Sequence, residues 1–386
     1  MAKNRAYLDW NASAPISDQA RQAMLAALDI DANASSVHAE GRTARRLIEN
    51  ARAGVAGLVG AKAEHVVFTS GATEAAATLL TPRYRMGRSP LAVSRVYVCA
   101  TDHPCVLGGG QFPAERVTVI GVDGNGIVDS AALRAALAAH DKAEGLALVA
   151  MHVANNETGV LQPIAEIGGI AKEAGAIVVL DAVQAAGRVP LDISDGYADF
   201  LILSSHKIGG PKGAGAIVAA SDLMMPAALI TGGGQEHGHR AGTENVAAIA
   251  GFGAAARGAL AGLTAMGEVR AMRDAIEAEI ARLAPDAIFY GQGAERLPNT
   301  TFFSLPGLKA ETAQIAFDLA GVALSAGSAC SSGRVGPSHV LKAMGHDGEG
   351  GLRVSIGRDT TPQEMELFRK ALEGITARRS AKREAA

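Results

Sequence analysis

Short apolar runs alternate with helical patterns over about residues 17–255 of the chain. The runs read HVVFTS, VSRVYVCA, LALVAMHV, AIVVLDAV, DFLILSSH and AGAIVAA, in that order. Near-continuous apolar strands are typical of a parallel sheet that is buried on both faces. The pattern therefore predicts a mainly parallel α/β sheet covered by helices, with functional residues at the carboxyl ends of its strands.

The pattern changes after about residue 255. A long helical stretch rich in Ala and Arg is followed by the runs TTFFSL and LRVSIGR, with helical segments between and after them. These features predict a large domain over 15–255 and a smaller α+β domain formed by 1–14 and 256–376. Residues 377–386 lack apolar periodicity, and we expect a disordered tail there.

The composition is that of a globular protein without a basic surface. Hydrophobic residues make up 48% of the 386 residues and charged residues 19%, with a formal net charge of -3. Such a chain lacks the basic field that attracts nucleic acid or anionic lipid, so neither is an expected partner. No apolar run reaches the roughly 18 residues of a membrane span, and the first residues lack the apolar core of a signal peptide. We therefore expect a cytoplasmic protein.

Two residues at predicted strand ends suggest a cofactor. Lys207 follows the run FLILSSH and precedes the glycine-rich stretch IGGPKGAGA, while Asp181 ends the run AIVVLD. A lysine after a strand is usually an exposed surface charge, but a carboxylate ending a buried strand needs a cationic partner. A protonated pyridine nitrogen is such a partner, and pyridoxal phosphate combines a lysine Schiff base with an aspartate on that nitrogen. Together the two residues favour this cofactor.

A candidate phosphate site follows the first apolar run. The segment TSGATEA places residues 70–73 where a strand passes into a helix, and backbone amides at such a helix start favour an anion. Small residues at this kind of turn are at least as often simple helix caps. Residues 204–206, directly before Lys207, offer further donors.

The three cysteines are too few for a disulfide framework. Cys330 lies in SAGSACSSGRVGPS, whose small residues predict an exposed loop, and the nearby Arg334 favours a thiolate. A single cysteine is usually a small buried hydrophobe, but this segment has no apolar pattern, so we interpret Cys330 as a nucleophile. Cys99, in the run VYVCA, is expected in the core. Cys105 lies two residues after His103, and a chemical role for it stays open.

Several motifs occur in an order that resembles one known family. They are YLDWNASAP, NNETG, LDAVQ, SSHKIGGPKG, GGGQEHGHRAGTEN and GSACSSGRVGPSHVLKAMG. Over about residues 7–372 the chain resembles the NifS/IscS-type cysteine desulfurases, which are fold-type I pyridoxal-phosphate enzymes of the aminotransferase class V group. The resemblance implies an α/β fold whose large domain has a mainly parallel sheet of the seven-stranded type.

The resemblance also implies roles for individual residues. Lys207 would form the Schiff base with pyridoxal phosphate and act as the base at Cα of the substrate, and Cys330 would attack the substrate sulfur and hold it as a persulfide. The other implied cofactor contacts are Asp181 at the pyridine nitrogen, Gln184 at the phenolic oxygen, His103 on the ring, Asn155 beside it, and Ala72, Thr73, Ser204, Ser205, His206 and Thr243 at the phosphate. Thr243 would come from a second subunit. Substrate contacts would come from Arg353, Asn155 and Asn33.

The implied reaction converts L-cysteine to L-alanine in a homodimer and passes the sulfur to a protein acceptor or iron-sulfur scaffold. No resident metal is expected, although Cys330 could transiently bind an iron-sulfur cluster. The route that uses the sulfur stays open between cluster assembly, nitrogenase maturation and tRNA thiolation, as does activity on selenocysteine.

Four positions depart from the family pattern, and we expect them at the edges of the pocket: Trp10, Ala34, Ala76 and Ala77. One alternative keeps the cofactor and makes the chain a class V aminotransferase or lyase that acts on another amino acid. Another makes it a non-catalytic partner protein with the same fold. Release of alanine and sulfide from cysteine would favour the desulfurase over the first alternative. Absence of the absorbance of a lysine-bound cofactor would favour the second alternative.

Overall fold

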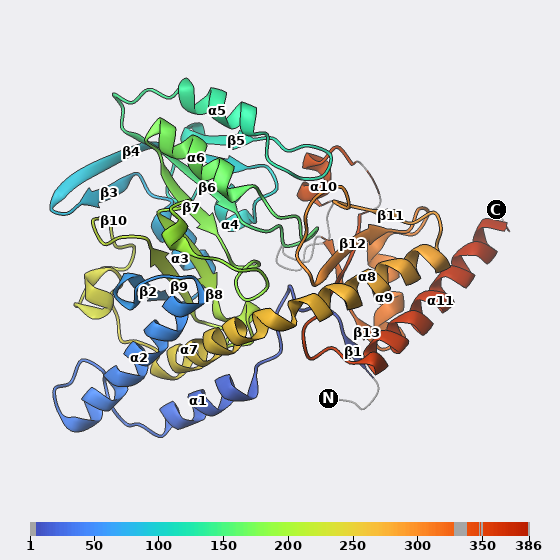
Figure 1. Ribbon diagram of the computed structural model, residues 1–386, viewed down its shortest axis with the longest axis horizontal. Helices are drawn as coiled ribbons and strands as arrows, with labels where there is room; N and C mark the ends of the chain where they lie inside the picture. Colours follow the sequence, from blue (N-terminus) through green and yellow to red (C-terminus); the bar gives the residue numbers. More distant parts are fainter. Residues whose placement is uncertain (1–4, 328–337, 347, 349, 385–386) are drawn as a thin grey trace.

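The computed structural model describes residues 5–327, 338–346, 348 and 350–384. A large body holds one long sheet, and a smaller body holds a second sheet near the carboxyl terminus (Figure 1). The helices α7 (Val246–Ala261) and α8 (Met266–Leu283) run in succession from the large body into the smaller one.

The large sheet has nine strands within the described part of the chain. In spatial order the strands are β10 (Met224–Pro226), β3 (Arg83–Met86), β4 (Ser89–Cys99), β6 (Leu146–His152), β7 (Ile177–Asp181), β8 (Phe200–Ser204), β9 (Gly215–Ala219) and β2 (Val66–Thr69), with β5 (Val117–Ile120) also on β4. Strands β5, β4, β6, β7 and β8 run parallel, and β9 pairs antiparallel with both β8 and β2. The predicted α/β sheet is confirmed, and β3 and β10 add two strands to the expected seven.

Both faces of this sheet are buried, which explains its continuous apolar strands. In β7, Val178 and Leu180 pack into one core, while Ile177 and Val179 pack into the core on the opposite face. The helices on the first face are α2 (Ala39–Leu58), α5 (Ser130–Ala138), α6 (Ile164–Ala174) and α7, and those on the second are α3 (Ala72–Leu79) and α4 (Pro104–Leu107). Helix α1 (Asp18–Leu28) packs against α7.

The smaller body combines an antiparallel sheet with helices and receives the start of the chain. Its sheet has the order β11 (Ile288–Phe289), β12 (Thr300–Ser304), β15 (Leu352–Ser355) and β14 (Ser325–Ala326). Strand β1 (Ala6–Tyr7) pairs in parallel with β13 (Val322–Ala323). The helices are α8, α9 (Ala310–Leu319), α10 (His339–Ala343) and α11 (Pro362–Glu384).

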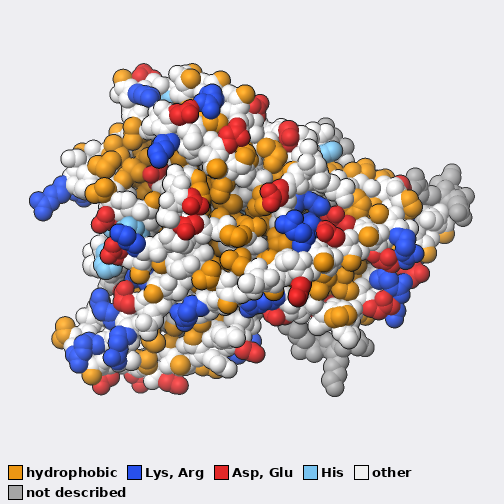
Figure 2. Space-filling model, viewed as in Figure 1, with side chains coloured by type: hydrophobic (Ala, Val, Ile, Leu, Met, Phe, Trp, Pro, Cys, Tyr) orange, Lys and Arg blue, Asp and Glu red, His pale blue; other side chains and the backbone are white. Residues whose placement is uncertain are grey.

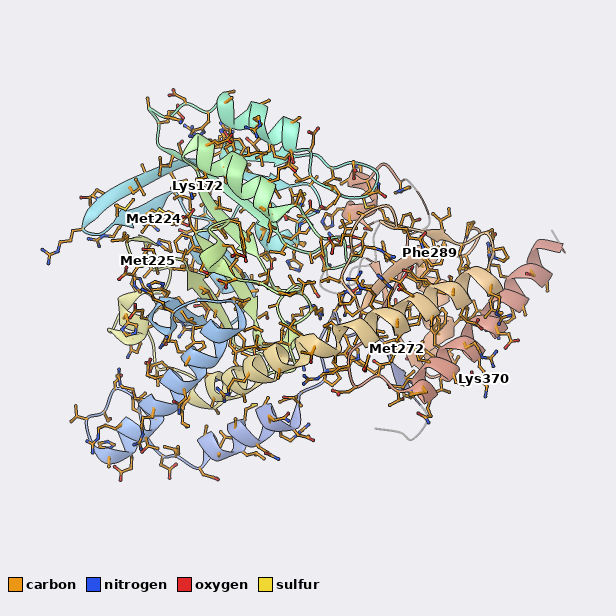
Figure 3. The ribbon with its side chains drawn as sticks, in the orientation of Figure 1. Lys172, Met224, Met225, Met272, Phe289 and Lys370 are labelled. Atoms are coloured by element: carbon orange, nitrogen blue, oxygen red, sulfur yellow. The ribbon has the colours of Figure 1, made fainter. Side chains whose placement is uncertain are left out.

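A separate hydrophobic core holds the smaller body together. Phe317 of α9 stacks on Phe368 of α11, with ring centroids 5.5 Å apart. Met272 and Phe289, labelled in Figure 3, pack against the same core, whereas Met224 and Met225 belong to the far edge of the large body. The short 3-10 helices of the chain are η1 (Ala63–His65), η2 (Ala114–Arg116), η3 (Ile193–Asp195), η4 (Ser205–Lys207), η5 (Gln235–Gly238) and η6 (Gly262–Ala265).

Helices α7 and α8 form a long, mostly apolar helical stretch that Arg257 interrupts. The helical stretch Val246–Leu283 is long and apolar enough to cross a membrane, by length and composition only, and 56% of its most apolar window is buried within the protein. Helix α7 packs between α1 and α2, and its Phe252 belongs to the core under the large sheet. Close helix packing therefore accounts for its apolar composition. The predicted domain boundary at residue 255 falls inside α7.

The expected disordered tail is wrong for residues 377–384, because α11 continues to Glu384. Arg379 donates from Nε to the carbonyl oxygen of Pro306 at 2.9 Å and from Nη1 to Asp286 at 2.8 Å. These acceptors come from distant segments, so the local polar pattern of the tail did not indicate them.

Apolar side chains gather near the middle of the face shown in Figure 2, between α6 and the α7–α8 segment. A hollow of about 480 Å³ lies there, and its lining includes Ile164, Leu191, Leu263 and Met266.

Candidate active site

The carboxyl ends of the parallel strands lie along one edge of the large sheet and border a cavity of about 490 Å³. Asp181 ends β7, His152 ends β6, and Lys207 closes the turn that follows β8. The volume falls within the roughly 300–1,000 Å³ of small-molecule sites. Eight predicted site residues line the cavity: Ala72, Thr73, His103, Asp181, Gln184, Ser204, His206 and Lys207.

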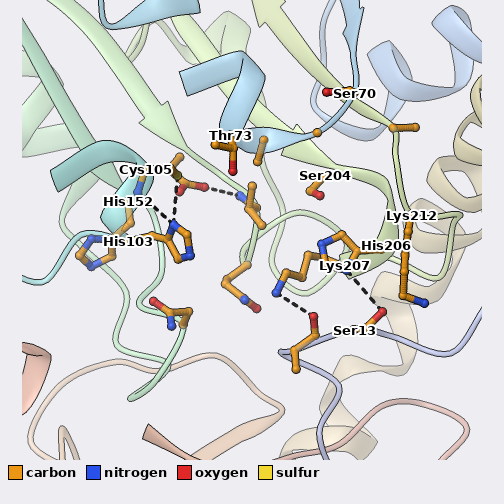
Figure 4. A pocket seen from close by; sticks show the side chains of 18 of the residues that line it. Ser13, Ser70, Thr73, His103, Cys105, His152, Ser204, His206, Lys207 and Lys212 are labelled. Atoms are coloured by element: carbon orange, nitrogen blue, oxygen red, sulfur yellow. Dashed lines mark hydrogen bonds between the residues drawn. The ribbon is translucent and has the colours of Figure 1, made fainter. Parts of the chain in front are cut away.

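Lys207 directs its amine into the cavity. The 3-10 helix η4 turns the chain directly after β8, and the side chain of Lys207 then extends toward the amino-terminal segment. Its Nζ donates to the carbonyl oxygens of Asn11 and Ala12, the latter at 3.0 Å. In Figure 4, Lys207 and His103 lie on opposite sides of the same space. The alternative of an ordinary exposed lysine is therefore wrong.

Asp181 and His103 form another part of the wall. The Asp181 side chain is buried and accepts a hydrogen bond from the Val183 amide at 3.0 Å. Burial raises the pKa of this carboxyl above its ordinary value, while the Val183 amide and the His103 ring oppose that rise. His103 caps α4, and its Nδ1 accepts the Cys105 amide at 3.3 Å, so a neutral ring carries its proton on Nε2.

The start of α3 borders the cavity and suits an anion. Its N-cap, Gly71, supplies no side-chain cap, so the amides of the first turn remain available. The chain approaches closely here, because a Cβ on Gly215 would lie 2.6 Å from the backbone of Gly71. Ser204 and His206 add side-chain donors from the end of β8.

His206 is a neutral group at neutral pH. Burial, followed by the charges of Lys207, Lys212 and Arg188, lowers the pKa of its imidazole to about 4. Its Nδ1 lies 3.3 Å from the hydroxyl oxygen of Ser13. A neutral ring in this position can donate a hydrogen bond without adding a titrating charge.

Two of the predicted contacts lie behind the cavity wall. Ser205 is fully buried, and its hydroxyl has no hydrogen-bond partner among the described residues. Asn155 donates to the carbonyl oxygen of Thr101 at 2.9 Å, and its Oδ1 accepts two backbone amides of the following turn. The next residue, Asn156, lines the cavity in its place.

Arg353 lies in β15 and does not line the cavity, but it contacts Asn156, which does. Its Nη1 donates to the carbonyl oxygen of Asn156 at 2.9 Å, and its Nη2 donates to Asp9 at 2.8 Å. Its Nε is buried without a partner among the described residues. Asn33 is exposed between α1 and α2 and lies outside the cavity lining.

Thr243 is also exposed, and it lines an adjoining cavity of about 180 Å³ rather than the one with Lys207. The two cavities share Ser70, Gly213 and Ala214.

The three cysteines lie in different settings. Cys330 falls outside the described residues, as does Arg334. Cys99 is in the core as predicted, and burial raises the pKa of its thiol to about 12. Cys105 lines the cavity, with its sulfur 3.0 Å from Nδ1 of His103.

Four positions depart from the family pattern and do not line the cavity of about 490 Å³: Trp10, Ala34, Ala76 and Ala77. Ala34 and Ala76 belong to the two cores of the large body. Trp10 lines a small neighbouring cavity that also touches Lys207.

Comparison with known proteins adds a family to this geometry. The family described as Aminotransferase class-V matches residues 6–368. A cysteine desulfurase of Cereibacter sphaeroides is 39% identical over 384 residues, covering 96% of this chain and 95% of the relative. A NifS-like protein from Rickettsia africae ESF-5 superposes with a TM-score of 0.86 at 33% identity, covering 96% of this chain and 99% of that one.

The chain belongs to the class V aminotransferase family, among its NifS/IscS-type cysteine desulfurases.

A further structural relative, SspA in complex with cysteine, superposes with a TM-score of 0.72 at 27% identity, covering 92% of this chain and 100% of that one. Members of this family are pyridoxal-phosphate enzymes, which agrees with the cofactor expected from Lys207 and Asp181.

Several lining residues were not singled out from the sequence: Ser13, His152, Asn156 and Lys212. His152 ends the apolar run LALVAMH, so the strand-end rule that identified Asp181 applies to it as well. Its Nδ1 lies 2.6 Å from the buried carboxylate of Asp102. Ser13 reaches the cavity from the amino-terminal segment, and no local pattern indicates that approach.

Proposed function

We propose that this protein is a pyridoxal-phosphate-dependent cysteine desulfurase, which converts L-cysteine to L-alanine and holds the sulfur as a persulfide on Cys330. The observation that carries the proposal is the convergence of three groups on one cavity. They are the Lys207 amine, the buried Asp181 carboxylate and the uncapped start of α3.

The residues present fit the cofactor. Lys207 would hold it covalently, Asp181 would face the pyridine nitrogen, and the α3 amides with Ser204 and His206 would receive the phosphate. The pKa of Asp181 is raised because burial outweighs the groups that stabilise its negative charge. A protonated ring nitrogen beside the carboxylate would provide further stabilisation of that charge. Bound there, pyridoxal phosphate supplies an electron sink for the amino-acid Cα.

The chain itself supplies the base and the substrate contacts. The Lys207 amine is held by two carbonyl oxygens at the cavity wall, from which a neutral amine can take a proton from Cα. Arg353 suits the substrate carboxylate because a guanidinium binds it through two parallel hydrogen bonds. Among the residues that the structure describes, the buried Nε of Arg353 has no hydrogen-bond partner, which supports this assignment.

The sulfur step balances without an external oxidant. The Cys330 thiolate attacks the substrate sulfur, the S–S bond forms as the C–S bond breaks, and the remaining three-carbon amino acid gains the protons that make it alanine. A second thiol, on a protein acceptor or as a reductant, then removes the outer sulfur.

We further propose a cytoplasmic homodimer in which Thr243 completes the phosphate site of the partner subunit. Thr243 is exposed and lies outside the cavity of its own chain, as a residue with that role would. We propose the two domains that the sequence suggested, with the boundary moved to the end of α7, because Ala256 and Ala259 pack in the core of the large body.

The test is to mix the purified protein with L-cysteine and a reductant and to measure alanine and sulfide. We expect the two products in equal amounts. Lys207→Ala should lose the visible absorbance of the lysine-bound cofactor and lower turnover by about 10²–10⁴-fold or more. Release of another keto acid or amine without sulfide would favour a different class V activity.

Cys330→Ala separates the sulfur chemistry from cofactor binding. This variant should keep the cofactor absorbance and lose sulfide formation. Cys99→Ala is the matched control, because Cys99 is a core thiol whose removal leaves the chemistry intact. Full turnover by Cys330→Ala would refute the assigned nucleophile.

A further inference from the structure

Arg188 is a buried cation that no step above uses. It lies in the turn after β7, and only 8% of its surface is exposed. It lines the small cavity that also touches Lys207, and it lines the hollow bordered by Ile164 and Leu191. Burying a charge is costly unless the surrounding groups hold it, which makes its partners informative.

Those partners are two proposed active-site residues. Nη1 of Arg188 donates to the backbone oxygen of Gln184 at 2.6 Å and to its side-chain Oε1 at 2.7 Å. Nη2 donates to the carbonyl oxygen of Lys207 at 3.3 Å. One rigid group thereby joins the turn after β7 to the turn after β8.

The contact with Oε1 decides which way the Gln184 amide faces. An arginine can only donate hydrogen bonds, so its guanidinium can bond to the oxygen of the Gln184 amide but not to the NH₂ group. The nitrogen of Gln184 faces away and donates to the carbonyl oxygen of Asn11 at 3.0 Å. An amide nitrogen carries two hydrogens, and Asn11 uses one of them, which leaves a donor for a ligand in the cavity that Gln184 lines.

The second contact restrains the backbone that carries the amine. The Lys207 amine donates to the same Asn11 carbonyl oxygen that receives the Gln184 amide. Arg188, Gln184, Asn11 and Lys207 therefore form a closed ring of hydrogen bonds beside the cavity. Removing Arg188 frees the amide to rotate and removes one restraint on the Lys207 main chain.

Arg188 stays charged while it does this. Burial, together with the nearby Arg353, lowers the pKa of its guanidinium to about 10, so it carries a proton at neutral pH. Within the described residues, carbonyl oxygens rather than a carboxylate surround it.

We propose that Arg188 is a positioning residue, which holds the Gln184 amide with its N–H donor toward the cofactor and fixes the main chain of Lys207. The inference rests on the proposed function, because Gln184 is assigned there to the phenolic oxygen of the cofactor. An N–H donor at that oxygen stabilises the deprotonated form of the lysine-bound cofactor and lowers its proton affinity.

The experiment is a pH titration of the visible absorbance of the cofactor in the holoenzyme. In Arg188→Met, the midpoint should rise by about one pH unit, because the cofactor loses both an oriented donor and a nearby positive charge. Arg188→Lys keeps the charge but lacks the planar fork, so its midpoint should lie between those of Arg188→Met and the wild type. If Arg188→Met does not fold, Arg188→Lys still provides the test.

A double variant tests whether Arg188 acts through Gln184. If it does, Arg188→Met combined with Gln184→Leu should shift the midpoint by less than the sum of the two single shifts. Arg273→Met is the matched control, because Arg273 is a buried arginine that donates to the carbonyl oxygens of Leu297 and Thr300. Its midpoint should equal that of the wild type.

An unchanged midpoint in both Arg188 variants, additive shifts in the double variant, or an equal shift in Arg273→Met would each overturn the inference. If the wild type shows a normal cofactor spectrum and the Arg188 variants have the wild-type titration midpoint, only the role of Arg188 is overturned and the proposed function stands. Wild-type protein that forms no lysine-bound cofactor would overturn both.

Discussion

At the scale of single residues, position at a strand end determines most of the chemistry. Asp181 and His152 are paired across β6 and β7, so both side chains emerge where these strands stop. Both side chains are buried, so they are not surface charges, and both line the cavity, so they are not part of the hydrophobic core. The strand-end rule therefore identified Asp181 and Lys207, and it would have identified His152.

The cysteines give a prediction at this scale. We expect Cys99 to resist alkylation by iodoacetamide at pH 8 in the folded protein, because it is fully buried and its thiol has a pKa of about 12. A thiol with that pKa is about 10⁻⁴ thiolate at pH 8, and the thiolate is the reactive form. Peptide mapping by mass spectrometry should detect modified Cys99 only after unfolding.

Cys105 is the internal comparison for that measurement. It is half-buried and lines the cavity, so it should react in cofactor-free protein and be protected when the cofactor is bound. Equal labelling of Cys99 and Cys105 in the folded protein would contradict the assigned burial.

At the scale of elements, a glycine in α6 allows a close contact with the bend between η3 and β8. Helix α6 contains two consecutive glycines with different surroundings. A Cβ on Gly168 would lie 2.4 Å from the carbonyl oxygen of Tyr197, whereas a Cβ on Gly169 would meet nothing within 4 Å. Gly168 therefore allows α6 to approach Tyr197 closely, whereas Gly169 makes no such contact.

We therefore expect the two alanine substitutions in α6 to have opposite signs. Gly168→Ala should lower the free energy of unfolding by about 1–3 kcal/mol, because the new methyl group overpacks a rigid backbone contact. Gly169→Ala should raise it by up to about 1 kcal/mol, since alanine favours the helix and the site is open. Urea unfolding monitored by circular dichroism measures both, and a loss of stability in Gly169→Ala would contradict the packing described.

A buried ion pair shows how another element is held. Glu236 accepts from Arg52 of α2 at 2.7 Å and from the Phe68 amide at 2.8 Å. Glu236 has a φ of 47°, in the left-handed region that ordinary residues seldom adopt. These bonds keep the strained η5 turn against β2, next to the cavity that Thr243 lines.

At the scale of the whole molecule, the amino-terminal segment joins the two bodies at the proposed active site. Asn11 is almost fully buried, and its side chain donates to Thr300 at 2.9 Å and accepts from Asn299 at 3.0 Å. Its carbonyl oxygen accepts from Lys207 of the large body. The smaller body therefore supports the position of the amine through one residue.

The proposed dimer gives a prediction at this scale. We expect sedimentation to report about twice the 39.3 kDa chain mass for the cofactor-loaded protein. If Thr243 acts across the subunit boundary, mixing Lys207→Ala with Thr243→Ala protomers should produce one intact site in each mixed dimer. Sulfide formation by the mixture should then exceed that of either variant alone.

The control for this experiment mixes each variant with itself under the same exchange conditions. A matched pair, Lys207→Ala with Asp181→Ala, should show no gain, because both residues line the cavity of their own chain. No gain in the Thr243 mixture would place Thr243 in the site of its own chain.

The sequence by itself determined the strands of the large sheet and the residues at their carboxyl ends. Buried parallel strands must be apolar along their whole length, so the runs marked both the elements and the edge where Asp181 and Lys207 lie. The same local information did not reveal β3 and β10, whose strands are short and partly exposed. It was also misleading for residues 377–384, because the acceptors of Arg379 are distant in the chain.

Only the tertiary structure decided which neighbours face the cavity. Asn155 and Asn156 are adjacent and chemically identical, yet the first caps a turn and the second lines the site. The role of Arg188 likewise appears only when Gln184 and Lys207 are brought together by two different strands. Side-chain direction and long-range hydrogen bonds depend on packing between distant segments. The periodicity of apolar residues shows only which face of each helix or strand is buried.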